Sequence, residues 1–176
     1  SRSASATWST RTSPSSSSPE GATGRAPGAG LVRPGTDKAL TEAQGKAVMF
    51  GTRAAQAHNI LDEVGPNYKP VVVATMHGAE SIPGANMAVN AAAGPNEQKG
   101  VQAQRNFIKA VLRQESGAAI NQAEFNNARI QYFPQPGDKP EVIAQKKANR
   151  ELAIQGFGTI AGPKGGKVVE TERANK

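Results

Sequence analysis

The residue with the clearest potential for chemistry is Glu115, which lies in the segment LRQESG at positions 112–117. A carboxyl group near the end of a helix can act as a general acid when a desolvated cleft raises its pKa. The large apolar residues that would build such a cleft are scarce, since aromatic residues make up 5% of the sequence. We therefore expect no catalytic residue and predict that the protein is not an enzyme.

Other combinations of residues that support catalysis or metal binding are missing from the sequence. Cysteine is absent, which excludes disulfides, thiol catalysis and thiolate metal sites. His58 and His77 are the only histidines, and neither has neighbours that would complete a metal site, so we interpret both as structural. We expect no metal and no cofactor.

Basic residues are concentrated in two places along the sequence, and this concentration indicates a possible binding function. The net charge is +7, and a positive balance favours polyanionic partners such as nucleic acid. The alternative is that these residues are ordinary solvated helix faces that keep the protein soluble. The candidate contacts to DNA or to an acidic partner are Arg105, Lys109, Arg113, Lys146, Lys147 and Arg150.

The first element that must position these residues is a helix expected over residues 37–65. Thr41 and Gln44 form a capping-box pattern at its start. Its apolar residues recur at alternating intervals of three and four, a heptad seam over about three heptads. The seam consists of Leu40, Ala43, Ala47, Phe50, Ala54, Ala57, Leu61 and Val64.

Alanine at four of the eight seam positions requires a packing partner that approaches closely. Gly45 and Gly51 each weaken the isolated helix by about 1 kcal/mol relative to alanine. The helix therefore depends on a partner, which is either a later helix of the same chain or a second molecule. Low aromatic content and 19 glycines favour an oligomer or a component of an assembly.

Three further helices are expected in a basic module at residues 96–158. The first runs from about Asn96 to Ser116, after Pro95 at its first position. Asn121 and Glu124 cap the second, which carries Phe125, Tyr132 and Phe133 as aromatic packing residues. The prolines and glycine of YFPQPGD, residues 132–138, then force a turn, and the last helix begins near Pro140 and ends at Gly156 and Gly158.

The remaining segments are expected to lack regular structure, which gives a mainly α protein of about four helices in an elongated arrangement. Residues 1–36 form a low-complexity extended tail that we expect a partner surface to hold. Residues 66–95 form a Gly/Ala-rich irregular linker, either a surface loop with buried anchors or a weakly membrane-active segment. Residues 159–176 form a mobile or partner-held tail. No apolar run is long enough to predict a membrane span.

Two resemblances to known families bear on function. Glu115 stands in a Glu-Ser-Gly context similar to that of lysozyme-like lytic transglycosylases, but the stretch that follows, AAINQAEFNNARIQYF, lacks the Gly-Leu-Met-Gln segment of those enzymes. Residues 40–65 and 100–158 resemble a region of the internal virion, or DNA-ejection, proteins of short-tailed bacteriophages and related prophages. The QESGA, EF and YFPQPGD segments carry this second resemblance, with Gln114 where that family has Arg.

The second resemblance implies a protein packaged in the capsid interior or tail lumen that leaves with the genome and enters the host cell envelope. Its implied partners are further copies of itself, portal and tail proteins, phage double-stranded DNA and, transiently, the host membrane. One alternative is a static portal or tail adaptor or plug. A less favoured one is a peptidoglycan lytic transglycosylase with Glu115 as general acid.

Overall fold

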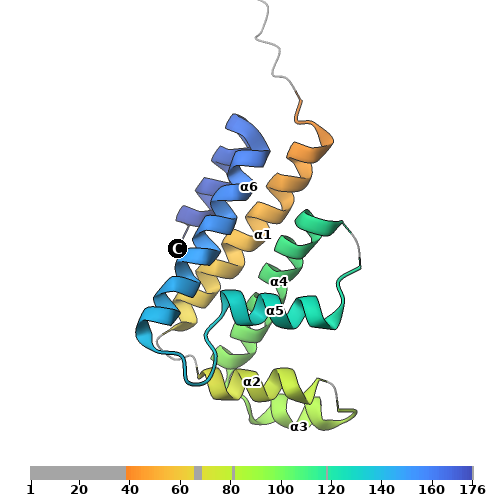
Figure 1. The fold of residues 1–176 in the computed structure, drawn as a ribbon, viewed down its shortest axis with the longest axis vertical. Coiled ribbons are helices and arrows are strands. Elements are labelled where there is room, and N and C mark those ends of the chain that lie inside the picture. The colour runs from red at the N-terminus through yellow and green to blue at the C-terminus, as the bar shows by residue number, and fades with distance from the viewer. Residues whose placement is uncertain (1–38, 66–68, 81, 118, 176) are drawn as a thin grey trace, which may run out of the picture. The chain divides into compact units, whose positions relative to one another are not determined.

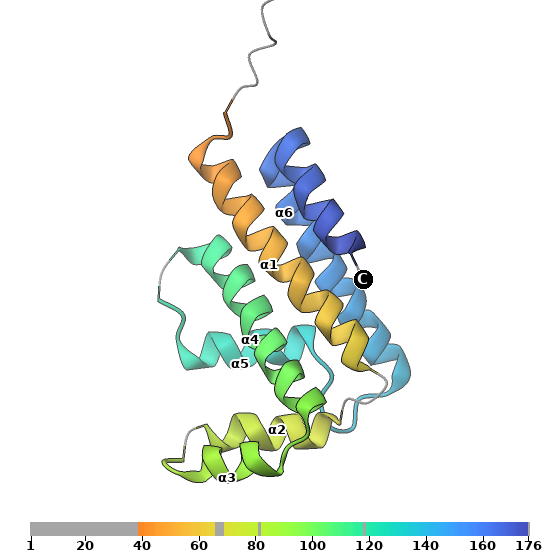
Figure 2. The same cartoon turned by 180° about the vertical axis from the view of Figure 1, so that it is seen from behind.

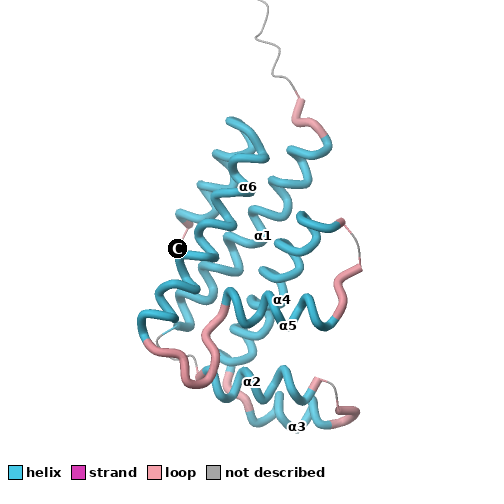
Figure 3. The backbone as a smooth tube through the Cα atoms, in the orientation of Figure 1, coloured by secondary structure: helices cyan, strands magenta, loops and turns pink. Residues whose placement is uncertain are grey.

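A computed structural model describes residues 39–65, 69–80, 82–117 and 119–175. Within these residues the chain forms helices and no strand (Figure 3), so the prediction of a mainly α protein is confirmed. The expected tail at residues 1–36 lies outside the described residues. The helices are α1 (Glu42–Val64), α2 (Pro70–Ala79), α3 (Ala85–Ala92), α4 (Pro95–Ser116), α5 (Gln122–Tyr132) and α6 (Pro140–Ala174).

Helix α1 lies at the centre of this arrangement, between α4 and α6 (Figure 1), and packs closely on both. The capping box forms as predicted: the Thr41 hydroxyl accepts from the Gln44 N–H, and the Gln44 side chain accepts from the Thr41 N–H. The heptad seam is largely filled within the chain. Its buried members are Ala47, Ala54, Ala57, Leu61 and Val64, Phe50 is half-buried, and Leu40 and Ala43 are exposed.

Helix α6 contains a reversal at Gly162, where φ is 72° and ψ is −177°. This backbone conformation is essentially restricted to glycine. The reversal divides α6 into a first limb, residues 140–161, and a second limb, residues 163–174, which run in opposite directions and both contact α1 (Figure 2). A Cβ atom on Gly166 would lie 2.8 Å from the carbonyl oxygen of Gly158, so the limbs meet at glycines.

The second limb overturns two sequence-based predictions. Gly156 and Gly158 do not end the helix, and the described part of the tail predicted at residues 159–176 is helical on both sides of Gly162, up to Ala174. The physical reason is the close approach of this segment to α1: a Cβ on Gly165 would lie 2.5 Å from Val48 Cγ2. The glycines that suggested a flexible tail are needed for helix packing.

The core is built around aromatic residues of α4 and of the C-terminal end of α5, where Phe133 is the C-cap residue. Phe107 and Phe133 are fully buried and meet edge to face, with ring centroids 5.6 Å apart. Tyr132 lies against the same Phe107 ring at 5.3 Å. This cluster continues into the α1–α6 contact through Ile154 and Phe157, so the aromatic segment before the turn joins α4, α5 and α6.

The region predicted as an irregular linker at residues 66–95 contains two short helices. Pro70 starts α2 at its first position, and Gly84, with φ of 82°, separates α2 from α3. Val73 and Met76 of α2 are buried against Val101 of α4, in a second, smaller core. The helical pattern in α2 and α3 is only two or three turns long, and it is hard to recognise in a sequence rich in alanine and glycine.

Candidate functional site

The YFPQPGD turn is held by hydrogen bonds from its own side chains. Asp138 accepts from the Gln135 N–H at 2.8 Å and from the ammonium group of Lys146. The hydrogen bond from Lys146 and the one from the Gln135 backbone hold the pKa of Asp138 below its ordinary value. The turn therefore places a carboxylate where it neutralises a lysine of α6.

Gln135 closes the end of α5 from the same turn. Its Nε2 donates to the carbonyl oxygens of Phe133 at 2.9 Å and Arg129 at 3.3 Å, and its Oε1 accepts from Arg129 at 2.9 Å. The Arg129 carbonyl oxygen also accepts from the N–H of the C-cap residue Phe133 at 3.1 Å, so Gln135 adds a second bond there and supplies a donor to the Phe133 carbonyl just past the helix end.

Arg150 connects the turn to α1. Its Nη1 donates to the Tyr132 carbonyl oxygen at 2.7 Å, its guanidinium lies 5.5 Å from the centre of the Phe133 ring, and its Nε donates to His58 Nδ1 at 3.4 Å. Only 5% of the residue is exposed. A single buried side chain thus joins α1, α5 and α6.

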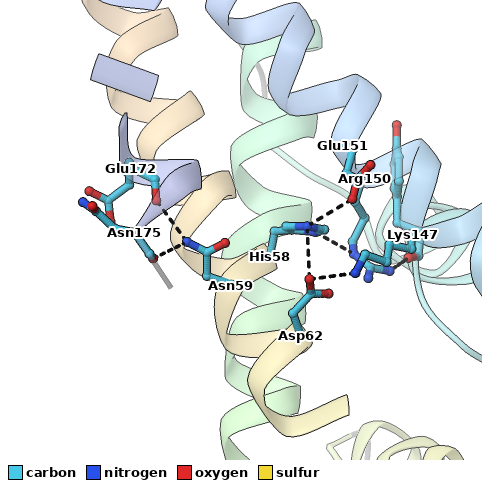
Figure 4. A network of polar contacts seen from close by, with 9 residues as sticks. His58, Asn59, Asp62, Lys147, Arg150, Glu151, Glu172 and Asn175 are labelled. Atoms are coloured by element: carbon cyan, nitrogen blue, oxygen red, sulfur yellow. Dashed lines mark hydrogen bonds and ion pairs between the residues drawn. The ribbon is translucent and has the colours of Figure 1, made fainter. Parts of the chain in front are cut away.

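His58 lies at the centre of a polar network between α1 and the first limb of α6 (Figure 4). Its Nε2 is 3.7 Å from both the Asp62 and the Glu151 carboxylate. Asp62 in turn accepts from Lys147 at 2.8 Å. Burial is the main cause that lowers the pKa of His58, and the nearby Asp62 carboxylate opposes this shift in part.

This geometry corrects the prediction for the second basic cluster. Lys146 and Arg150 are buried and bonded within the chain, to Asp138 and to the His58 and Tyr132 groups, so they do not face DNA or an acidic partner. Lys147 is half-exposed but paired with Asp62. Sequence spacing alone could not separate these roles, because the neutralising carboxylates come from a turn and from a different helix.

The first basic cluster is placed differently. Lys109 and Arg113 are exposed on α4, whereas Arg105 is half-buried and pairs with Glu80 of the α2 end. His77 lies beside this pair: its Nε2 is 3.0 Å from Gln104 Oε1 and its Nδ1 is 3.2 Å from Glu80. Burial lowers the pKa of His77, and the hydrogen bond with Gln104 opposes that shift. The exposed basic residues of α4 are therefore Lys99, which pairs with Glu63 of α1 at 3.5 Å, and Lys109 and Arg113.

Glu115 is exposed near the end of α4, on the rim of a hollow of about 290 Å³. Tyr132 lines the same hollow, and its pKa is raised first by burial and then by the Glu115 charge. An exposed carboxylate lacks the desolvation that poises a general acid.

Two polar residues of the site were missed from the sequence. Gln135 is assigned no role from the sequence, although its place just after a predicted helix end is a signal for capping. Asn59 Nδ2 donates to the carbonyl oxygens of Glu172 and Asn175 at 3.0 and 2.7 Å (Figure 4). No signal could reveal this contact, because its partners lie in the segment predicted to be a mobile tail.

These elements define a mainly α-helical protein in whose described part several charged residues pair across element contacts, among them Lys146 with Asp138 and Lys147 with Asp62. Comparison with models of known protein families, with curated proteins and with solved structures finds no match. Among the described residues, no helix combines the length and apolar character needed to cross a membrane. The same part of the chain holds no cluster of three or more histidine and acidic residues suited to a metal ion.

Proposed function

We propose that the protein is an internal virion protein of a short-tailed bacteriophage, assembled at the portal or tail channel, that takes part in genome ejection into the host cell. The observation that carries this proposal is the resemblance of the QESGA, EF and YFPQPGD segments to that family. The capsid interior or tail lumen is the proposed location, followed by the host envelope on infection.

The positions of the residues in these three segments indicate that the segments have a structural role. Phe133 is buried in the core, Phe125 packs against it, and Asp138 ties the turn to α6. A signature whose members hold helices together fits a protein that acts by assembly, and it requires no catalytic group.

Charge supports the proposed contact with double-stranded DNA. Lys109 and Arg113 are exposed and one helical turn apart on α4, and the chain as a whole has a charge of +7. Exposed lysine and arginine bind phosphates without reading sequence, as a protein that accompanies any packaged genome requires. Further copies of the chain, portal and tail proteins and, transiently, the host membrane are the other proposed partners.

The competing functions make different predictions. A static portal or tail adaptor or plug would occupy the same place in the particle but would stay there after the genome leaves. A peptidoglycan lytic transglycosylase would require Glu115 as general acid, and the exposure of that side chain gives this alternative no support.

Localisation of the chain in the intact virion tests the proposal directly. We expect a ring with the symmetry of the portal or tail, inside the capsid or the tail lumen. A position on the capsid exterior would rule the proposal out. Zymography of the purified chain and of Glu115→Gln tests the enzymatic alternative, which requires lysis by the parent chain and its loss in the variant.

A further inference from the structure

The hydrogen bond from Arg150 determines which nitrogen of His58 carries the proton at neutral pH. An arginine Nε has a hydrogen to donate and cannot accept one. Because Arg150 Nε donates to His58 Nδ1 at 3.4 Å, Nδ1 must present its lone pair, and the proton of the neutral ring is on Nε2. Nε2 faces the Asp62 and Glu151 carboxylates (Figure 4).

Acid must therefore add the second proton at Nδ1, the position that Arg150 occupies. A protonated Nδ1 and the Arg150 Nε–H would be two donors facing each other, each on a cationic group. Arg150 has to leave His58 before the imidazolium can be accommodated. Its movement also disturbs its hydrogen bond to the Tyr132 carbonyl oxygen and its contact with the Phe133 ring.

The charges around the imidazole do not remove this conflict. Asp62 of α1 and Glu151 of α6 favour the protonated ring, whereas Arg150 and Lys147 of α6 oppose it. Asp62 is already engaged by Lys147 at 2.8 Å. His58 is 3% exposed. Glu151 lies 3.7 Å from Nε2, on the other side of the ring, so it does not relieve the conflict between two donors at Nδ1.

We propose that His58 is an acid-released latch between α1 and the first limb of α6, in which protonation at Nδ1 expels Arg150 and frees residues 146–157 from α1. Release uncovers Ile154 and Phe157 of the limb and the buried alanines of the heptad seam of α1. These apolar surfaces then become available to another helix. The latch is a property of this chain and does not rest on the proposed function.

The expected size of the effect follows from linkage. In the opened state His58 is solvated and has its ordinary pKa near 6.5, whereas in the closed state Arg150 occupies Nδ1 and burial lowers the pKa of the ring. The opened state therefore gains protons as the pH falls below 6.5. Lowering the pH from about 7.5 to about 5.5 multiplies the opening equilibrium about tenfold. Most carboxylates keep their charge in this window.

Hydrogen exchange of the first limb, corrected for the intrinsic pH dependence of exchange, measures this opening. We expect residues 146–157 to exchange about tenfold faster, relative to intrinsic rates, at about pH 5.5 than at about pH 7.5. His58→Gln retains an oxygen that can accept from Arg150 and cannot take up a proton, so its limb should respond by less than twofold. His77→Gln, which removes the other buried histidine, should respond like the wild type.

The latch would be overturned by equal protection of the limb at both pH values in the wild type, or by an unchanged tenfold response in His58→Gln. NMR titration of the wild-type protein gives an answer even if the His58→Gln chain fails to fold. A native His58 ring that titrates at or above 6.5 while the limb stays protected would also exclude the proposal.

Discussion

Arg150 shows why a basic residue in the sequence need not be a binding residue. Its planar guanidinium holds several donors in a fixed fork, which lets it reach the Tyr132 carbonyl and His58 while it stacks near Phe133. A lysine has a single compact ammonium group and cannot make these contacts together. The side chain is therefore a connector of three helices.

Arg150→Lys should lower the free energy of unfolding by about 1–3 kcal/mol, because it leaves a buried carbonyl or imidazole without its donor. Urea denaturation at neutral pH measures the change. Arg53→Lys, at an exposed position of α1, is the matched control and should change stability by less than about 0.5 kcal/mol. Equal stability of the two variants would contradict the connector role.

Gly51 and Gly45 lie on the same helix and offer a paired test of the close approach between α1 and α6. A Cβ on Gly51 would lie 2.8 Å from Phe157 and Val169, whereas nothing lies within 4 Å of a Cβ on Gly45. Gly51→Ala should therefore destabilise by about 1–3 kcal/mol through overpacking. Gly45→Ala should stabilise by about 0.5–1 kcal/mol through helix propensity. Thermal unfolding measures the change in stability of both variants. A stabilising Gly51→Ala would show that α1 and α6 are not in close contact there.

At the scale of elements, the reversal in α6 is the feature on which the packing of α1 depends. Its second limb covers Gly51 with Val169 and places Gly165 against Val48. Asn59 then secures the end of this limb through two carbonyl groups. A helix that turned elsewhere would leave this side of α1 exposed.

Gly162→Ala should destabilise the protein by about 1–3 kcal/mol, because alanine is strained at φ of 72° and ψ of −177°. Gly156→Ala provides the comparison, since nothing lies near its added Cβ in the middle of the first limb, and should stabilise by about 0.5–1 kcal/mol. Circular dichroism during chemical denaturation measures both. The absence of a cost at Gly162 would indicate that the limbs join without this backbone conformation.

The elements that could be predicted from the sequence are those with strong local signals. The capping boxes at Thr41 and Asn121 predicted the starts of α1 and α5, and Pro95 and Pro140 predicted the starts of α4 and α6. The second limb of α6 could not be predicted, because a glycine that breaks an isolated helix and a glycine that admits a neighbouring helix look the same in sequence.

The candidate site was predictable only in part, for the same reason. The i, i+4 spacing correctly placed Lys109 and Arg113 on an exposed face of α4. It could not show that Asp138 and Asp62 neutralise Lys146 and Lys147, because these pairs form only after the turn and the α1–α6 contact exist.

At the scale of the whole molecule, the proposed contact with double-stranded DNA predicts that Lys109 and Arg113, which are exposed on α4, contribute to binding. Lys109→Glu with Arg113→Glu should weaken binding to double-stranded DNA and lower the dependence of log K on log salt by about two. Fluorescence anisotropy over a salt series measures both quantities.

Lys46→Glu with Arg53→Glu produces the same change in net charge on α1, at two exposed positions, and is the control for nonspecific attraction. Binding that falls equally in both double variants would mean that net charge alone attracts DNA, and the role assigned to the α4 surface would then be wrong.

The proposal that this protein leaves the particle with the genome is tested most directly by its copy number in virions before and after genome release. Quantitative mass spectrometry of full and emptied particles, with the major capsid protein as internal standard, provides that number. We predict that the chain is present in full particles and lost from emptied ones. Equal copy numbers in the two preparations would contradict ejection and identify the chain as a static component of the portal or tail.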